Sequence, residues 1–453
     1  MTEPGQPRGA SASDAASPSG PSLVARGLVA ARSQVQSGSV VFLRRALGVI
    51  MAVATLRYFW HGWIDAQFVE PKFHFTYAGF GWVHPLPEPF MELVFGIIGA
   101  AALLLALDRA PRFASFVLLL AFSYVQLCDK ANYLNHYYLV SLLCAYFALL
   151  PSGAGGRIAL GWIVALRLQV MFVYVHAGIA KWDASWLLEG EPLRLWLAAL
   201  DAPGPLGAVL SSGFVAISAS WGGMLLDVSA PFLLASRRTR RYAFTLVATF
   251  HVATAALFPI GIFPWLMIAA ATVFFEPSWW GPPVRAARAA AQQGAPVRVA
   301  AVAGLLLFQA MWPLRSLAAP GDPHWTEDGF RFSWKVMLIE KAATVEYVVV
   351  QRDAGRVERR VVDPRAELTR FQVEMMSGQP DMLLEYAHHL AERARFDAPV
   401  GATVEVYARS LASLNGGVAA PLIRPGVNLA SIERSAPRAA YVTLSAREGA
   451  RLL

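Results

Sequence analysis

Long apolar runs, recurring between about residues 46 and 314, constrain this chain more than any other feature of its sequence. A helix needs ~20 mostly apolar residues to cross ~30 Å of hydrocarbon, and many of these runs approach that length. Charged residues make up 15% of the 453 residues, whereas ordinary soluble domains contain about 25%. The sequence therefore predicts an integral membrane protein and argues against both a soluble and a disordered one.

The apolar runs predict about nine transmembrane helices, which would form an α-helical polytopic membrane bundle. The expected ranges are 46–64, 90–107, 113–128, 137–150, 159–179, 206–235, 242–258, 262–275 and 298–314. Arg residues gather before the first range and in every second connection after it. Because positive residues mark the cytoplasmic side, we expect a cytoplasmic N-terminus and a C-terminal part on the outer side. The net charge of +8 is accounted for in this way and does not indicate a nucleic-acid partner.

Composition divides the chain into three predicted parts. Residues 1–40 are expected to form a flexible tail, because their first half is rich in Gly, Ser, Pro and Ala and contains no secretory signal. Residues 41–314 hold the apolar runs. From 315 to 453 charges become frequent, and alternating runs such as 345–352 predict strands, interrupted by one helix at 381–394. We expect this last part to be an extramembrane β-rich domain.

Ionisable residues beside apolar helices are costly to bury, so each is a hypothesis about a functional site. One group follows the third range, where Asp129 and Lys130 are expected to neutralise one another. Asn135 and His136 come next and offer hydrogen-bond donors and acceptors to a neighbouring helix or a cavity. A satisfied polar turn with aromatic interface anchors explains the same residues equally well.

A second group, which contains Lys181, Trp182 and Asp183, follows the fifth range. The simplest interpretation is that Lys181 reaches the membrane interface or pairs with Asp183. The alternative is a lysine held in an apolar pocket, where desolvation favours the neutral amine and allows it to act as a base. That alternative requires a substrate with a proton to lose.

A third group combines His251 with a segment that contains Phe258 and Gly261 and is broken by prolines. Interrupted helices at membrane depth are tolerated mainly where the backbone is buried in protein or lines a cavity. A pocket is therefore expected here, and a plain helical hairpin is the simpler alternative. No metal site is predicted, because His388 and His389 are adjacent on a helix and point about 100° apart.

Taken in order, these motifs resemble the vitamin K-dependent gamma-carboxylase family, whose membrane part is also called the horizontally transferred transmembrane domain. The motifs that carry the resemblance are Trp82–Pro87, Met91–Val94, Asp129–Lys130, Asn135–Tyr138, Ala177–Asp183 with Trp186, Phe250–His251, Leu257–Phe263, Gly329–Met337 and Ser413–Gly416. Each motif is short, but their shared order and spacing cover the chain from about 45 to 430.

The resemblance implies a membrane enzyme that couples oxygenation of reduced vitamin K to carboxylation of glutamate in a protein or peptide substrate. Phylloquinol or menaquinol would be the quinol, O2 and CO2 would be co-substrates, and no metal would take part. It implies that Lys181 is the base and that Asn135 and His136 are the essential Asn-His pair. The remaining site predictions are His251, Trp182, Asp183, Phe258 and Gly261 around the quinone pocket, with Trp334 and Asn415 on the substrate side.

The chain departs from the family pattern at several positions. Ala180 stands where animal members often have a second Lys. In the outer domain, Gly417 replaces an expected Arg, and Arg424 and Asn428 each replace an expected Asp. Recognition of a protein substrate is therefore open. Two alternatives remain: a quinol epoxidase that carboxylates no protein, and a non-catalytic lipid- or quinone-binding membrane protein. The Arg- and Ala-rich composition suggests a bacterial inner membrane, with the C-terminal domain in the periplasm.

Overall fold

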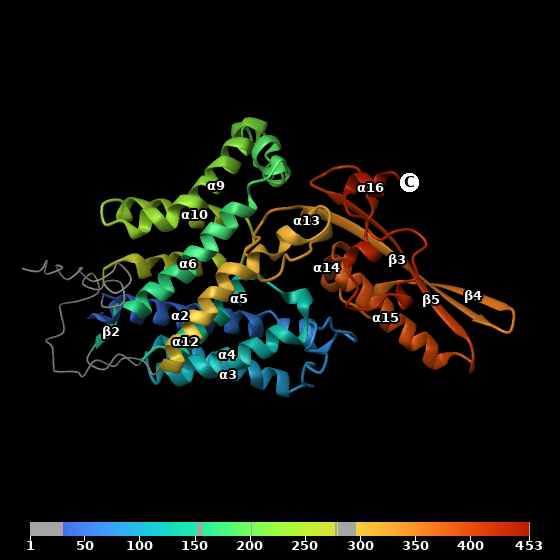
Figure 1. The fold of residues 1–453 in the computed structure, drawn as a ribbon, viewed down its shortest axis with the longest axis horizontal. Helices are drawn as coiled ribbons and strands as arrows, with labels where there is room; N and C mark the ends of the chain where they lie inside the picture. Colours follow the sequence, from blue (N-terminus) through green and yellow to red (C-terminus); the bar gives the residue numbers. More distant parts are fainter. Residues whose placement is uncertain (1–29, 152–155, 201, 277–278, 280–295, 453) are drawn as a thin grey trace, which may run out of the picture.

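The computed structural model describes residues 30–151, 156–200, 202–276, 279 and 296–452. A helical N-terminal part leads into a C-terminal part that contains a four-stranded sheet (Figure 1). The longer helices of the N-terminal part are α2 (Gly38–Trp60), α3 (Phe90–Ala106), α4 (Pro111–Cys128), α5 (Asn135–Leu149), α6 (Leu160–Ala180), α9 (Gly213–Ala235), α10 (Arg240–Leu257), α11 (Phe263–Ala271) and α12 (Pro296–Met311). Two short helices, α7 (Leu193–Ala198) and α8 (Pro205–Leu210), connect α6 to α9.

Five helices among the described residues are long and apolar enough to cross a membrane: α2, α4, α6, α9 and the run Pro296–Ala318. Helix α3 and the segment Phe263–Phe274 are shorter apolar helices. The protein is thus an integral membrane protein with a helical bundle, as predicted, whereas crossing by all nine helices stays a prediction. The expected span 206–235 is divided into α8 and α9, because the backbone at Ser212 is extended.

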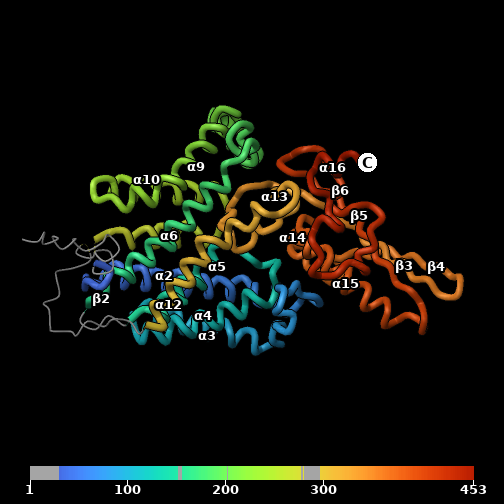
Figure 2. Tube along the Cα trace, viewed as in Figure 1, coloured from blue at the N-terminus to red at the C-terminus, as the bar shows by residue number. Residues whose placement is uncertain are grey.

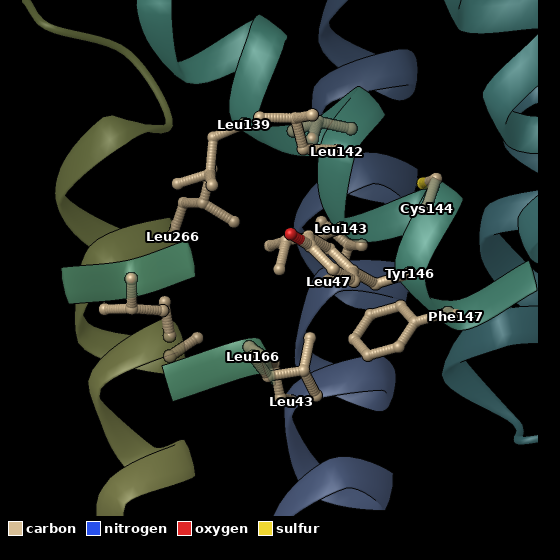
Figure 3. Close-up of a cluster of buried hydrophobic side chains, with 14 of the residues drawn as sticks. Leu43, Leu47, Leu139, Leu142, Leu143, Cys144, Tyr146, Phe147, Leu166 and Leu266 are labelled. Carbon is tan, nitrogen blue, oxygen red and sulfur yellow. The ribbon is translucent and has the colours of Figure 1, made fainter. Parts of the chain in front are cut away.

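Close helix packing holds the bundle together. Helix α2 lies against α3, which in turn lies against α4 (Figure 1). A Cβ atom added at Gly48 of α2 would lie 2.3 Å from the backbone nitrogen of Ala106, so only glycine permits this approach. Figure 3 shows the centre of the core, where Leu43 and Leu47 of α2 lie near Leu143 of α5 and Leu166 of α6.

The C-terminal part is a four-stranded antiparallel sheet with helices packed on one face (Figure 2). Its strands lie in the order β4 (Arg356–Val362), β3 (Lys341–Asp353), β5 (Thr403–Leu414), β6 (Ala420–Pro421), and its helices are α13 (Pro323–Thr326), α14 (Arg370–Gly378), α15 (Pro380–Asp397) and α16 (Ala446–Ala450). Tyr347 and Val349 of β3 share a buried cluster with Leu383 of α15, as expected from the two-residue period of a strand. The predicted strand at 345–352 and helix at 381–394 lie within β3 and α15.

A small two-stranded sheet lies at the start of the described chain. Strand β1 (Gln34–Gln36) pairs with β2 (Arg157–Ala159), which immediately precedes α6. Residues 1–29 of the expected flexible tail lie outside the described residues. The predicted part boundaries at 40 and 314 stay predictions.

Candidate functional site

A cavity of about 210 Å³ lies among α6, α7, α9 and α10, at the end of α6 nearest the C-terminal part. Most of its wall is apolar or aromatic, and Val336 and Met337 of the C-terminal part complete it. The described lining residues with ionisable or hydroxyl side chains are Tyr174, Lys181, Asp227, His251 and Thr254. A few polar groups in an otherwise apolar cavity are typical of a small-molecule site.

Lys181, the first residue after α6, places its amine beside a carboxylate of α9. Its Nζ donates to Asp227 Oδ2 over 2.8 Å and lies 3.3 Å from the carbonyl oxygen of Ala177. The amine also lies 5.4 Å from the ring centre of Trp186. Lys181 and Asp227 are both only 7% exposed. Lys181 therefore pairs with Asp227 and not with Asp183, the partner that the sequence suggested.

A glycine brings these two helices together one turn from the pair. A Cβ atom added at Gly178 of α6 would lie 2.6 Å from Cγ2 of Val228 and 3.2 Å from Cβ of Asp227. A contact of 2.6 Å is too short for two carbon atoms, so a side chain at this position would require neighbouring atoms to shift. Gly178 thus permits the approach of α6 to α9 that joins Lys181 to Asp227.

Sequence reasoning missed Asp227, although a signal was present. Asp227 is the single charged residue in the predicted span 206–235. A lone carboxylate in an apolar membrane helix is by default a functional hypothesis whose partner should be sought among basic residues of other helices. The proximity of Lys181 and Asp183 in sequence favoured the wrong carboxylate.

His251 of α10 is another polar residue on the cavity wall. Its Nε2 lies 3.0 Å from the hydroxyl of Tyr174, and its ring centre lies 5.7 Å from that of Phe263. The ring is 2% exposed, and among the described residues its Nδ1 has no hydrogen-bond partner. Phe258, predicted with His251, also lines the cavity.

His136 lies next to the cavity, behind one of its wall residues. Its ring centre is 5.9 Å from that of Phe263, and its Nε2 would be 3.8 Å from a Cβ added at Gly261. Neither His136 nor Gly261 is a lining residue of the cavity. The structure therefore brings His136, Gly261 and His251 together around Phe263, with His251 the histidine on the wall.

Asn135 is engaged with backbone and hydroxyl groups outside the cavity wall. Its Oδ1 accepts from the hydroxyl of Tyr133 over 3.0 Å, and its Nδ2 donates to the carbonyl oxygen of Lys335 over 3.0 Å. Trp334, predicted on the substrate side, is 1% exposed and stacks on Tyr138 with 5.3 Å between ring centres. Both contacts join α5 to the C-terminal part.

Asn415 lies where the sheet meets the helices around the cavity. Its Nδ2 donates to Ser185 Oγ over 2.9 Å, and its Oδ1 accepts from the backbone N–H of Glu340 over 2.9 Å. Glu340 also accepts from Trp196 Nε1, and Trp196 lines the cavity. The end of β5 and the start of β3 therefore lie at the cavity rim.

Two of the predicted pocket residues lie away from the cavity wall. Trp182 is 75% exposed, and Asp183 accepts the backbone N–H of Ser185 over 2.8 Å in a local turn. Neither is a lining residue. They follow Lys181 in sequence, but the chain leaves α6 at that point, so the three side chains separate.

Within the described parts of the chain, no group of three or more His, Cys, Asp or Glu side chains is placed to hold a metal ion. His388 Nε2 lies 2.7 Å from the carbonyl oxygen of Ile432, and His389 Nε2 lies 2.8 Å from Glu367. The two adjacent histidines thus contact different groups, consistent with their divergence on a helix.

Two family matches together cover nearly the whole chain. Residues 33–279 match the HTTM domain, and residues 295–448 match the lumenal domain of vitamin K-dependent gamma-carboxylase. The chain belongs to the vitamin K-dependent gamma-carboxylase family. No solved structure matches it. The second match begins just before α12 and therefore includes this helix. In the structure of this family member, however, α12 packs against α6 of the first matched segment.

The Asp129-Lys130 motif of this family member joins its two parts. Lys130 Nζ lies 2.7 Å from Glu385 Oε2 and 3.1 Å from Asp381 Oδ2, both on α15. Asp129 instead accepts from Gln372 over 2.7 Å and lies 3.2 Å from His74 Nδ1. The expectation that Asp129 and Lys130 neutralise one another was wrong, because each side chain finds a separate partner.

Around Lys130 lies a cluster of charges that we call the junction network: Lys130, Arg331, Asp381, Glu385 and Arg438. Arg331 Nη1 lies 2.7 Å from Asp381 Oδ2, and Arg438 lies 3.7 Å from the other Asp381 oxygen. Burial alone would raise the pKa of Asp381, but the positive charges of Arg331, Lys130 and Arg438 outweigh burial and hold that pKa well below its usual range. The junction network therefore binds α15 to the membrane part through ionised groups.

Proposed function

We propose that this chain is a quinol-dependent glutamyl carboxylase, whose cavity holds the ring of reduced vitamin K and whose Lys181-Asp227 pair takes a proton from it. The observation that carries the proposal is the buried amine-carboxylate pair on the wall of an apolar cavity. With O2, reduced vitamin K supplies the strong base that removes a γ-proton from Glu, and CO2 then adds to the carbanion. Family membership supports this reaction class.

The cavity fits the ring of such a quinol and leaves its tail outside. Its volume of about 210 Å³ lies below the ~300–1,000 Å³ of typical ligand pockets, and aromatic side chains such as Trp186 and Phe258 line it. Ala219 of α9 and Ala253 of α10 are small lining residues, so little side-chain volume closes the cavity between these helices. A prenyl tail would leave the cavity there and enter the lipid.

The pair can accept a quinol proton without an isolated charge being created. The Lys181-Asp227 pair shares one proton and is neutral overall, whether that proton lies on the amine or on the carboxylate. When the pair accepts a second proton, from the quinol hydroxyl, it gains one positive charge. That charge balances the quinolate formed beside it, in a site where water is largely excluded. His251 lines the cavity and is the group that we assign to hydrogen-bond a quinol oxygen.

The remaining assignments follow from the same proposal. His136 supports the wall through Phe263, and a Glu-containing protein or peptide reaches the cavity along the rim formed by Glu340 and Asn415. The nine helical ranges would cross the membrane with the N-terminus in the cytoplasm. The C-terminal part would then face the periplasm of a bacterium, with part boundaries at 40 and 314.

One assay separates the possible functions. Purified protein is given anaerobically prepared vitamin K hydroquinone, O2, bicarbonate and a Glu-containing peptide, and both quinone epoxide and peptide mass are followed. Epoxide together with a peptide gain of one CO2 is the expected result. Epoxide alone would support the epoxidase without carboxylation, and neither product would support a quinone-binding protein without turnover.

Asp227→Asn tests the pair itself. Because the variant removes the carboxylate that partners the amine, we expect epoxide formation to fall by about 10²-fold. Asp183→Asn is the matched comparison, since Asp183 is close to Lys181 in sequence but does not contact its amine. We expect it to cost less than about threefold. Equal losses in the two variants would remove Asp227 from the mechanism.

A further inference from the structure

Residues 332–337, which we call the strap, bring the C-terminal part onto the membrane cavity. Val336 and Met337 at its end are lining residues of the cavity. They lie opposite groups from α6, α9 and α10, so the strap forms a wall that the membrane helices do not supply. The position of this wall sets the shape of the space available to a ligand.

The backbone of the strap has an intrinsically unfavourable conformation at three of its residues. Phe332, Trp334 and Met337 have φ values of 61°, 60° and 50°, in the left-handed region that side-chain-bearing residues rarely adopt. This conformation is unfavourable for such residues, because it brings Cβ close to the following carbonyl oxygen. Contacts from outside the strap must therefore hold it in place.

Those contacts come from the residues that begin α5. The backbone N–H of Phe332 donates to the hydroxyl of Tyr133 over 2.7 Å. That hydroxyl donates to Asn135 Oδ1 over 3.0 Å, and Asn135 Nδ2 donates to the carbonyl oxygen of Lys335 over 3.0 Å. Tyr133 and Asn135 thus fix two points of the strap through one continuous set of hydrogen bonds.

Aromatic packing supports the same arrangement. The ring of Phe332 lies edge-on to that of Tyr133, with 4.9 Å between centres. Trp334, between the two hydrogen-bonded points, is buried and stacked on Tyr138. These contacts join the strap to the segment 133–138, and Phe332 also lies 5.8 Å from Tyr77 between ring centres. The segment 133–138 therefore supplies the hydrogen bonds and the stacking that help to fix where Val336 and Met337 lie.

We propose that Tyr133 and Asn135 are positioning residues, which hold the strap as a wall of the cavity and act on quinol binding without touching the quinol. Both polar atoms of the Asn135 side chain are already engaged, one with a hydroxyl and one with a backbone carbonyl. This role differs from that expected for the Asn-His pair, in which Asn135 supports the geometry of His136. The role in quinol binding rests on the proposed function, whereas the holding of the strap does not.

Tyr133→Phe is the sharpest test, because it removes one hydroxyl and leaves the aromatic ring. Tyr124→Phe is the matched control, because it removes a hydroxyl that donates over 2.7 Å to the carbonyl oxygen of His84. Within the described part of the chain this hydroxyl forms no hydrogen bond with the strap. Two kinds of measurement are made on the full chain in detergent. They are the hydrogen-exchange rates of the backbone amides in 332–337 and the KM and kcat for vitamin K hydroquinone.

In Tyr133→Phe we expect exchange in 332–337 to accelerate about tenfold, because the Phe332 amide loses its acceptor. We also expect KM to rise about tenfold, whereas kcat should stay within about twofold of that of the unaltered protein. The pH profile of turnover should not shift, because the change affects ligand binding and not the reacting groups. Asn135→Asp should likewise raise KM and leave kcat nearly unchanged, because a carboxylate cannot donate to the Lys335 carbonyl. Tyr124→Phe should change none of these quantities.

Unchanged exchange in 332–337 for Tyr133→Phe and Asn135→Asp would overturn the proposal. A fall in kcat at unchanged KM would also overturn it, since that result places Asn135 at the reacting atoms. Absence of quinol turnover in the unaltered protein would instead refute the proposed function. The exchange measurement needs no turnover and would still decide whether the strap is held from 133–138.

Discussion

Two lysines that follow the C-terminal ends of apolar helices, Lys130 and Lys181, have very different surroundings. Each is 7% exposed and places its amine less than 3 Å from a carboxylate oxygen, at 2.7 Å and 2.8 Å. Lys130 lies in the junction network, among charges that come from the C-terminal part. Lys181 has one carboxylate, Asp227, and a cavity beside it. Exposure and the shortest amine–carboxylate distance are alike, so the neighbouring cavity is the feature that sets Lys181 apart from Lys130.

The largest expected effect is on turnover at Lys181. Lys181→Met keeps an apolar chain of similar length but removes the amine, so epoxide formation should fall by about 10²–10⁴-fold, the usual contribution of a general base. The unfolding midpoint should also fall, because Asp227 loses its buried partner, so turnover is compared per folded molecule. Lys72→Met, at an exposed lysine, is the control for both lysines. Turnover in Lys181→Met equal to that of the control would exclude Lys181 as the base.

Lys130→Met should lower stability much more than turnover per folded molecule. Removal of one partner leaves Glu385 buried without its cation, which costs about 3–5 kcal/mol in buried ion pairs. We expect a lower unfolding midpoint and faster proteolysis between the two parts, measured in detergent. Turnover per folded molecule should be much less affected than in Lys181→Met. If Lys130→Met were as stable as Lys72→Met, the junction network would not contribute to stability.

The smallest effect concerns the pH dependence of the junction network. The pKa of Asp381 is lower in the folded protein than its ordinary value of 3.8, so its stabilisation is complete above that value and is lost as the pH falls below it. Asp381→Asn should therefore lower stability by roughly 1–2 kcal/mol at pH 7. The difference from the unaltered protein should shrink on acidification to about pH 3. A difference independent of pH would show that Asp381 acts through packing alone.

Local sequence patterns predicted much of the fold. Apolar runs indicated the helices of the bundle, because burial in lipid or protein requires continuous apolar surface. Alternation indicated β3, and the sequence from 381 to 394 indicated α15. The break between α8 and α9 was missed, since Ser211 and Ser212 do not stand out within an apolar run. Helix α14, only nine residues long, was also missed.

Partners in the site were predicted less well, because they depend on contacts between distant residues. Lys181 meets Asp227 46 positions later, and Lys130 meets Glu385 255 positions later. Sequence proximity favoured Asp183 and Asp129 instead. Only helix packing, including the close approach at Gly178, selects the actual carboxylate. The roles of Lys181, Asn135 and His136 stay predictions until turnover is measured.

The strap also limits how the two matched segments can be exchanged between relatives. The cavity wall at Val336 and Met337 belongs to the second segment, and its anchor at Tyr133 and Asn135 belongs to the first. A chimera that joined the helices of one relative to the C-terminal part of another would have to transplant matching residues on both sides. Recombination at the boundary would otherwise leave the strap without its partners, so that the cavity would lack the wall formed by Val336 and Met337.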